Sequence, residues 1–131
     1  MGLPKTIKEE NKMKRDMDLI RKLLILIENN DDIKELVVPE DWNREEVAYH
    51  LKILDQVGYV ENNTKWAGNK PMWLMASLTW DGHEFLSSIK NNTIWERTKC
   101  EIKKTSLELG TIPLNVLKEF ATRQIKDLLG L

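Results

Sequence analysis

The side chains best suited to recognition chemistry lie on one predicted helix and one predicted hairpin. Arg44, Tyr49 and Lys52 fall on outward positions of the helix. Lys65 and Lys70 flank the tip of the hairpin. Arginine and lysine neutralise phosphates and read base edges, so the four basic residues are candidate contacts to duplex DNA, together with Tyr49 on the same helix face. We expect the first three in the groove and the two lysines on phosphates.

A second set of side chains on the same elements fits a protein partner. Glu45 and Gln56 occupy outward positions of the predicted helix, and Trp66 lies at the hairpin tip. A large apolar residue in a polar loop either folds back onto the protein or serves as a contact. These three residues are therefore candidate protein contacts, and both kinds of partner stay open.

The distribution of charge argues against a conventional approach to duplex DNA. Residues 31–62 contain three basic and nine acidic residues, a local charge of −6, whereas the whole chain carries −1. Residues 93–131 contain seven basic and five acidic residues, a local charge of +2. Because duplex affinity depends on neutralising phosphates, the acidic segment weakens the DNA hypothesis and favours the protein alternative.

Residues for catalysis or metal binding do not come together along the sequence. Cys100 has no second thiol for a zinc site, so we expect an ordinary half-buried helix residue. His50 and His83 have no acids or thiols at ligand spacing, and no glycine-rich phosphate loop is present. We predict structural or solvent-facing histidines, no enzymatic activity, no metal and no cofactor.

Length and composition predict one soluble domain. A chain of 131 residues that is 41% hydrophobic and 31% charged can bury a core without disulfides. The longest apolar run, residues 23–27, is far shorter than the roughly 20 residues that span a bilayer. The start lacks an apolar signal core, and the single cysteine fits a reducing compartment. We expect a cytoplasmic protein that does not insert into membranes.

Two helices and a hairpin are predicted in the first two thirds of the chain. The helices cover residues 16–29 and 44–57, and a short strand or turn over residues 33–39 separates them. The second helix buries one apolar stripe and ends at a glycine. This stripe consists of Val47, Leu51 and Leu54. The hairpin has strands at residues 59–61 and 72–78, joined by a polar loop.

Three further helices are predicted after the hairpin. The first starts after Thr79, and Gly82 in its first turn allows close packing. The second starts near Thr93, whose spacing to Glu96 is that of a capping box, and the third covers residues 113–129. Three tryptophans are expected in the core. They are Trp73 and Trp80 in or beside the hairpin, and Trp95 beneath the last helices.

Several segments resemble known families. The run REEVAYHLKILDQVGYV, residues 44–60, resembles the junction between recognition helix and wing in winged-helix repressors. The runs MKRDMDLIRKLLILI, SLTWDGHEFLSSI and TIWERTK, beginning at residues 13, 77 and 93, resemble a domain-of-unknown-function family of bacteria and their prophages. This family implies no settled activity.

Together these observations predict an α+β, mainly α, fold: a winged-helix domain with a β-hairpin wing and a C-terminal helical extension. The predicted parts are an appendage at 1–12, a winged-helix core at 13–91 and the extension at 92–131. The expected function is that of a DNA-binding transcriptional regulator of bacterial or prophage origin. The alternative is a protein-interaction module that binds a host or phage protein through its acidic helix face and C-terminal helices. A homodimer would form through residues 93–131.

Overall fold

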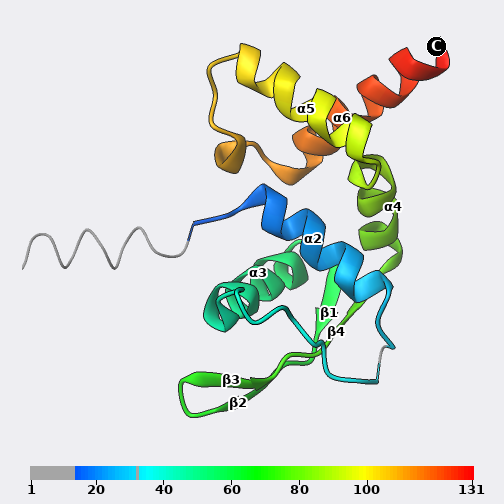
Figure 1. Ribbon diagram of the computed structural model, residues 1–131. Helices are drawn as coiled ribbons and strands as arrows, with labels where there is room; N and C mark the ends of the chain where they lie inside the picture. Colours follow the sequence, from blue (N-terminus) through cyan, green and yellow to red (C-terminus); the bar gives the residue numbers. More distant parts are fainter. Residues whose placement is uncertain (1–13, 32) are drawn as a thin grey trace, which may run out of the picture.

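The computed structural model describes residues 14–31 and 33–131, so the predicted appendage at 1–12 lies outside the described residues. The fold is α+β and mainly helical, as predicted, with two small antiparallel sheets (Figure 1). The elements follow in the order α2 (Met17–Glu28), α3 (Arg44–Gln56), β1 (Val60–Asn62), β2 (Lys65–Ala67), β3 (Lys70–Trp73), β4 (Ala76–Leu78), α4 (Trp80–Ile89), α5 (Asn92–Lys104), η1 (Leu109–Thr111) and α6 (Leu114–Leu129).

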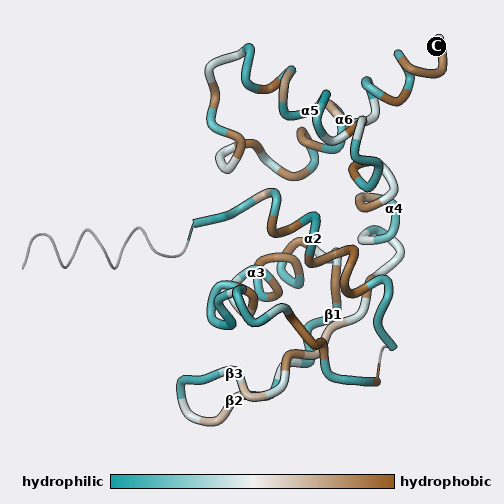
Figure 2. The backbone as a smooth tube through the Cα atoms, viewed as in Figure 1, coloured by the Kyte–Doolittle hydropathy of each residue, from teal (hydrophilic) through white to brown (hydrophobic). Residues whose placement is uncertain are grey.

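Helices α2 and α3 form the centre of the molecule. Asp16 caps α2 by accepting a hydrogen bond from the Leu19 backbone N–H, and Asn43 caps α3 in the same way. The hydrophobic segments of α2 and α3 lie next to each other (Figure 2). The predicted stripe of α3 faces this core, because its three members are fully buried. They are Val47, Leu51 and Leu54.

The hairpin is one long ribbon made of two ladders. Strand β1 pairs with β4 near the core, and β2 pairs with β3 farther out. We expected a loop up to residue 71 and one returning strand over 72–78, and both expectations were wrong. At the junction of the two ladders the pairing is irregular. The Met75 carbonyl accepts a hydrogen bond from the Asn63 N–H, and the Met75 N–H donates to Thr64 Oγ1. The Leu74 carbonyl accepts a bond from the Leu36 N–H, which anchors the ribbon to residues 33–38.

Gly82 sets how closely α4 approaches the ribbon. A Cβ atom at this position would lie 1.9 Å from the backbone oxygen of Tyr59, so no side chain fits. The Tyr59 ring stacks on Phe85 at 4.7 Å between centroids. The close packing predicted for Gly82 is therefore present.

Helices α4, α5 and α6 pack on one another beyond α2. Asp18 of α2 joins them by accepting hydrogen bonds from Trp95 Nε1 at 2.8 Å and Lys99 Nζ at 3.0 Å. Partial burial opposes ionisation of Asp18, but these two bonds and the charge of Lys99 lower its pKa overall. The N-cap of α5 is Asn91, which accepts a hydrogen bond from the Ile94 N–H, so the cap predicted at Thr93 was misplaced by two residues.

Two of the three tryptophans expected in the core are exposed. Trp95 is buried, with 2% of its surface accessible, whereas Trp73 and Trp80 are 56% and 75% exposed. Trp73 lies on the outer ladder, beyond the core, and Trp80 begins α4, whose buried side is occupied by Gly82 and Phe85. Cys100 is exposed rather than half-buried.

The helices formed by residues 14–31 and 33–131 include none with both the length and the apolar character needed to cross a membrane.

Candidate nucleic-acid interface

The predicted contact residues lie on two adjoining elements, α3 and the ribbon. Arg44 links them: its Nη2 atom donates to the carbonyl oxygens of Pro71 at 3.3 Å and Met72 at 3.0 Å. The same atom lies 3.8 Å from Glu35 Oε2. The Arg44 guanidinium is thus already engaged with protein groups and fixes β3 against the start of α3.

The remaining predicted positions of α3 differ in their accessibility. Lys52, Gln56 and Glu45 are exposed, as a contact role requires. Tyr49 is half-buried, and its ring meets that of His50 edge to face at 5.3 Å. Lys52 is therefore the best placed of the three predicted groove contacts.

His50 behind this face has a structural role. Its Nε2 atom accepts a hydrogen bond from the Asp16 backbone N–H at 2.9 Å, so Nδ1 carries the proton and donates to the Glu46 carbonyl at 2.7 Å. Burial lowers the pKa of His50, and this effect exceeds the opposing effects of the Glu46 carbonyl and of the Asp16 and Glu46 charges. The neutral ring joins α3 to the start of α2.

A shallow hollow of about 420 Å³ lies between the start of α3 and strand β3. It brings together three predicted contact residues: Arg44, Glu45 and Lys70. The other lining residues are Glu35, Pro71 and Met72. With two cations and two carboxylates, the hollow has no excess of positive charge.

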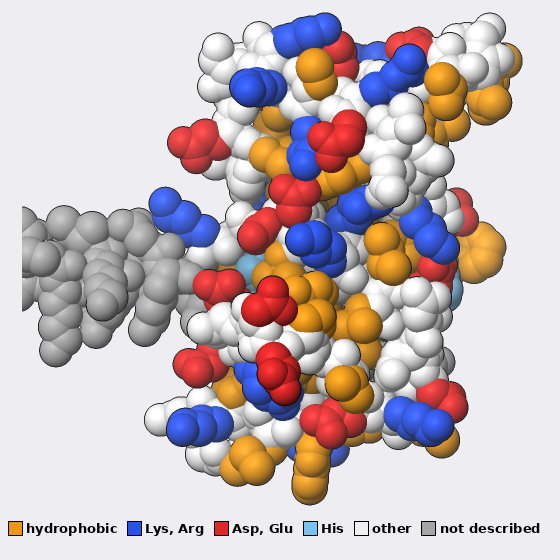
Figure 3. Space-filling model, viewed as in Figure 1, with side chains coloured by type: hydrophobic (Ala, Val, Ile, Leu, Met, Phe, Trp, Pro, Cys, Tyr) orange, Lys and Arg blue, Asp and Glu red, His pale blue; other side chains and the backbone are white. Residues whose placement is uncertain are grey.

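The outer ribbon, which consists of strands β2 and β3 and the turn between them (residues 65–73), is the most distinctive part of this surface. Trp66, Met72 and Trp73 are 54%, 49% and 56% exposed, and Lys65 and Lys70 are exposed beside them. Hydrophobic side chains stand out from the lower edge of the molecule, where the ribbon lies (Figure 3). Residues 62–80 contain these two lysines and no acidic residue.

The exposure of Met72 and Trp73 on this ribbon was not predicted from the sequence. Their alternation with neighbouring apolar residues indicated a strand buried on one face. The contrary signals were Pro71, since proline inside a strand favours an edge or a bulge, and the long acid-free stretch. The observed register is irregular here: Lys65 lies opposite Trp73, but Trp66 lies opposite Pro71.

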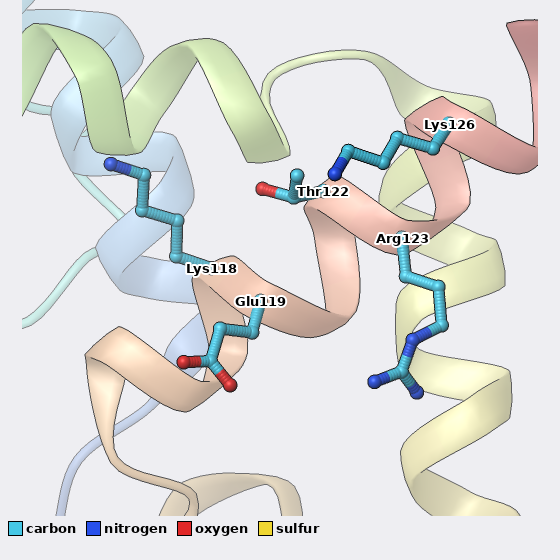
Figure 4. A pocket seen from close by; sticks show the side chains of 5 residues that line it. All are labelled: Lys118, Glu119, Thr122, Arg123 and Lys126. Carbon is cyan, nitrogen blue, oxygen red and sulfur yellow. The ribbon is translucent and has the colours of Figure 1, made fainter. Parts of the chain in front are cut away.

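A second hollow, of about 370 Å³, lies on α6, far from the ribbon (Figures 1 and 4). Its lining residues are Lys118, Glu119, Thr122, Arg123 and Lys126. The Arg123 guanidinium lies 5.7 Å from the centre of the Phe120 ring. This cationic surface is separate from the predicted DNA contacts on α3 and the ribbon, and it lies within residues 93–131, where a homodimer contact is predicted.

Potential metal ligands do not come together in the part of the chain that the structure describes. Within residues 14–31 and 33–131, no group of three or more potential ligands is placed to hold a metal ion. His83 and Cys100 are exposed and lie on different helices, α4 and α5.

Comparison with known proteins places the chain in a family. A family described as "Hypothetical protein (DUF2513)" matches residues 14–108. A protein of Haemophilus influenzae described as uncharacterized is 34% identical over 121 residues, which is 90% of this chain and the whole of that protein. The chain belongs to the DUF2513 family, and the predicted resemblance to a bacterial domain of unknown function is confirmed. No solved structure matches, so the winged-helix architecture stays a prediction.

Proposed function

We propose that this chain is a cytoplasmic DNA-binding regulator of winged-helix type, of bacterial or prophage origin, and that it binds without catalysis or a cofactor. Helix α3 is followed through Gly58 by a ribbon, in the order of a recognition helix and its wing. The observation that carries the proposal is the exposed, acid-free ribbon with Lys65 and Lys70.

The charges on this surface also set a limit on duplex affinity. Arg44 is engaged with the ribbon, which leaves Lys52, Lys65 and Lys70 as the cations that contact phosphates. Each neutralised phosphate contributes about −0.9 to the slope of log affinity against log salt concentration. We therefore expect a slope of roughly −3, shallower than that of strongly basic DNA-binding proteins.

The test is the anisotropy of a fluorescein-labelled DNA duplex titrated with the protein between about 50 and about 200 mM salt. The paired substitutions Lys65→Ala and Lys70→Ala should weaken binding and reduce the slope by about 2. Lys118→Ala with Lys126→Ala removes two cations of α6 and should leave both quantities unchanged, once sedimentation has shown that the variant keeps the oligomeric state of the wild type. Absence of binding at low salt, or loss of binding in the α6 variant alone, contradicts the proposal.

A second candidate function, protein interaction, is supported by a different feature of the same surface. Tryptophan and methionine are enriched in protein interfaces, and the ribbon exposes Trp66, Met72 and Trp73. Exposed Glu45 and Glu46 add an acidic rim that suits a basic protein surface. A photocrosslinker at position 66 should then yield a protein adduct that resists nuclease and is lost on reversing both glutamates. An adduct that survives this reversal rules out the acidic-rim version.

We further propose that residues 93–131 supply the contact of a homodimer. The end of α6 projects from the molecule and exposes Leu128 and Leu129, which are 56% and 68% accessible (Figure 1). Analytical ultracentrifugation should detect a dimer that Leu128→Glu dissociates. A monomer at all accessible concentrations contradicts this part of the proposal.

A further inference from the structure

The outer ribbon combines flat aromatic surfaces with cations and lacks acids. Trp66 and Trp73 each expose more than half of their surface. Lys65 is the cross-strand partner of Trp73, so an ammonium group and an indole occupy neighbouring positions. Proteins that bind single-stranded nucleic acid use this combination, with bases stacked on aromatic rings and phosphates held by cations.

The ribbon is also placed where a strand can reach it without crossing α3. The β2–β3 ladder extends beyond the helices, and its turn contains Gly68 with φ +62° (Figure 1). The start of α3, in contrast, exposes Glu45 and Glu46. A regular duplex laid along α3 would bring phosphates toward these carboxylates, whereas a flexible single strand on the ribbon avoids them.

Base stacking adds a reason to favour unpaired bases. Bases inside a regular duplex already stack on each other and cannot offer both faces to an indole. Unpaired bases can, and stacking tolerates any sequence because every base has a π-face. Trp66 and Trp73 each leave more than half of their surface uncovered by the other described residues, so this surface is available to a base.

We propose that the outer ribbon binds unpaired nucleic acid, with Trp66 and Trp73 stacking on bases and Lys65 and Lys70 contacting phosphates. This inference rests on the proposed function, since it specifies the form of nucleic acid that the same surface prefers. The shared chemistry is a single strand of DNA or RNA, and the two sources are separated by the choice of probe.

The test compares three labelled probes by anisotropy: oligothymidylate of about 12 nucleotides, oligouridylate of equal length, and a duplex of equal length. At least one single strand should bind more tightly than the duplex. Trp66→Ala or Trp73→Ala should weaken single-strand binding roughly fivefold or more. Trp80→Ala is the matched control, because Trp80 is exposed but lies on α4, and it should change binding less than about twofold.

The outcomes separate this inference from the proposed function. Duplex binding without preference for a single strand, or single-strand binding that the two ribbon variants leave intact, overturns the inference and leaves the DNA proposal standing. Failure of all three probes contradicts both, and a nuclease-resistant adduct at position 66 would then assign the ribbon to a protein. Circular dichroism of the alanine variants checks that each is folded, which their exposed positions lead us to expect.

Discussion

His50 makes folding sensitive to pH through one backbone hydrogen bond. Protonation of Nε2 would remove the acceptor for the Asp16 N–H, so the folded state favours the neutral ring. Because the folded-state pKa of His50 lies below its ordinary value of 6.5, stability is complete above about pH 6.5. We predict that the free energy of unfolding decreases as the pH falls below 6.5 toward the folded-state pKa.

Urea unfolding at a series of pH values between about 5 and about 8 measures this effect. His50→Leu removes the titrating ring and should flatten the dependence in this range, at a cost in stability because Asp16 loses its acceptor. His83→Gln is the control, since His83 is exposed, and it should keep the wild-type dependence. An unchanged slope in His50→Leu would mean that other groups are responsible.

Gly82 is the residue at which a single added methyl group should do most damage. Its Cβ would lie 1.9 Å from a backbone oxygen, and a backbone atom cannot rotate away as a flexible side chain can. We predict that Gly82→Ala lowers the free energy of unfolding by about 3 kcal/mol or prevents folding. Glu84→Ala, at an exposed position of the same helix, should change it by less than about 0.5 kcal/mol. Equal stability of the two variants, measured by denaturant unfolding, would show that the Tyr59 contact is not tight.

At the scale of elements, helices were easier to predict than the ribbon. Helical stripes and caps are local, so the ranges of α2, α3 and α6 agree with the predictions within about two residues. The ribbon depends on long-range bonds at Thr64, Leu74 and Met75 that leave no local pattern. Trp73 and Trp80 were wrongly predicted to lie in the core for the same reason, because the alternation of apolar residues does not indicate where the core ends.

Helix α6 is part of the core except for its last turn, although its apolar stripe had predicted burial up to Leu128. Leu117 is fully buried, whereas Leu128 is 56% exposed on the projecting end. Leu117→Ala should lower the free energy of unfolding by about 2–5 kcal/mol, because it leaves a cavity between packed helices. Leu128→Ala should change it by less than about 0.5 kcal/mol at concentrations where the protein is monomeric. A small effect of Leu117→Ala would mean that α6 is dispensable to the core.

At the scale of the whole molecule, the class of fold followed from the sequence, but the exposure of the candidate contact residues followed only in part. Lys52, Lys65, Lys70 and Trp66 were predicted and are exposed. The bracing role of Arg44 was not foreseen, since its partners are carbonyl groups 27 and 28 positions away in the chain. The summed charge of residues 31–62 predicted an acidic surface, whereas the fold separates the acidic start of α3 from the basic, aromatic ribbon.

The most direct test of nucleic-acid binding through this surface is a ¹H–¹⁵N NMR titration with the duplex and the single strand in turn. The chain has five tryptophans, whose indole N–H signals report separate parts of the molecule. We predict that the signals of Trp66 and Trp73 shift with added nucleic acid while those of Trp80 and Trp95 stay. Shifts confined to Trp80, Trp95 or the backbone of α6, or no shifts with either probe, would contradict the account.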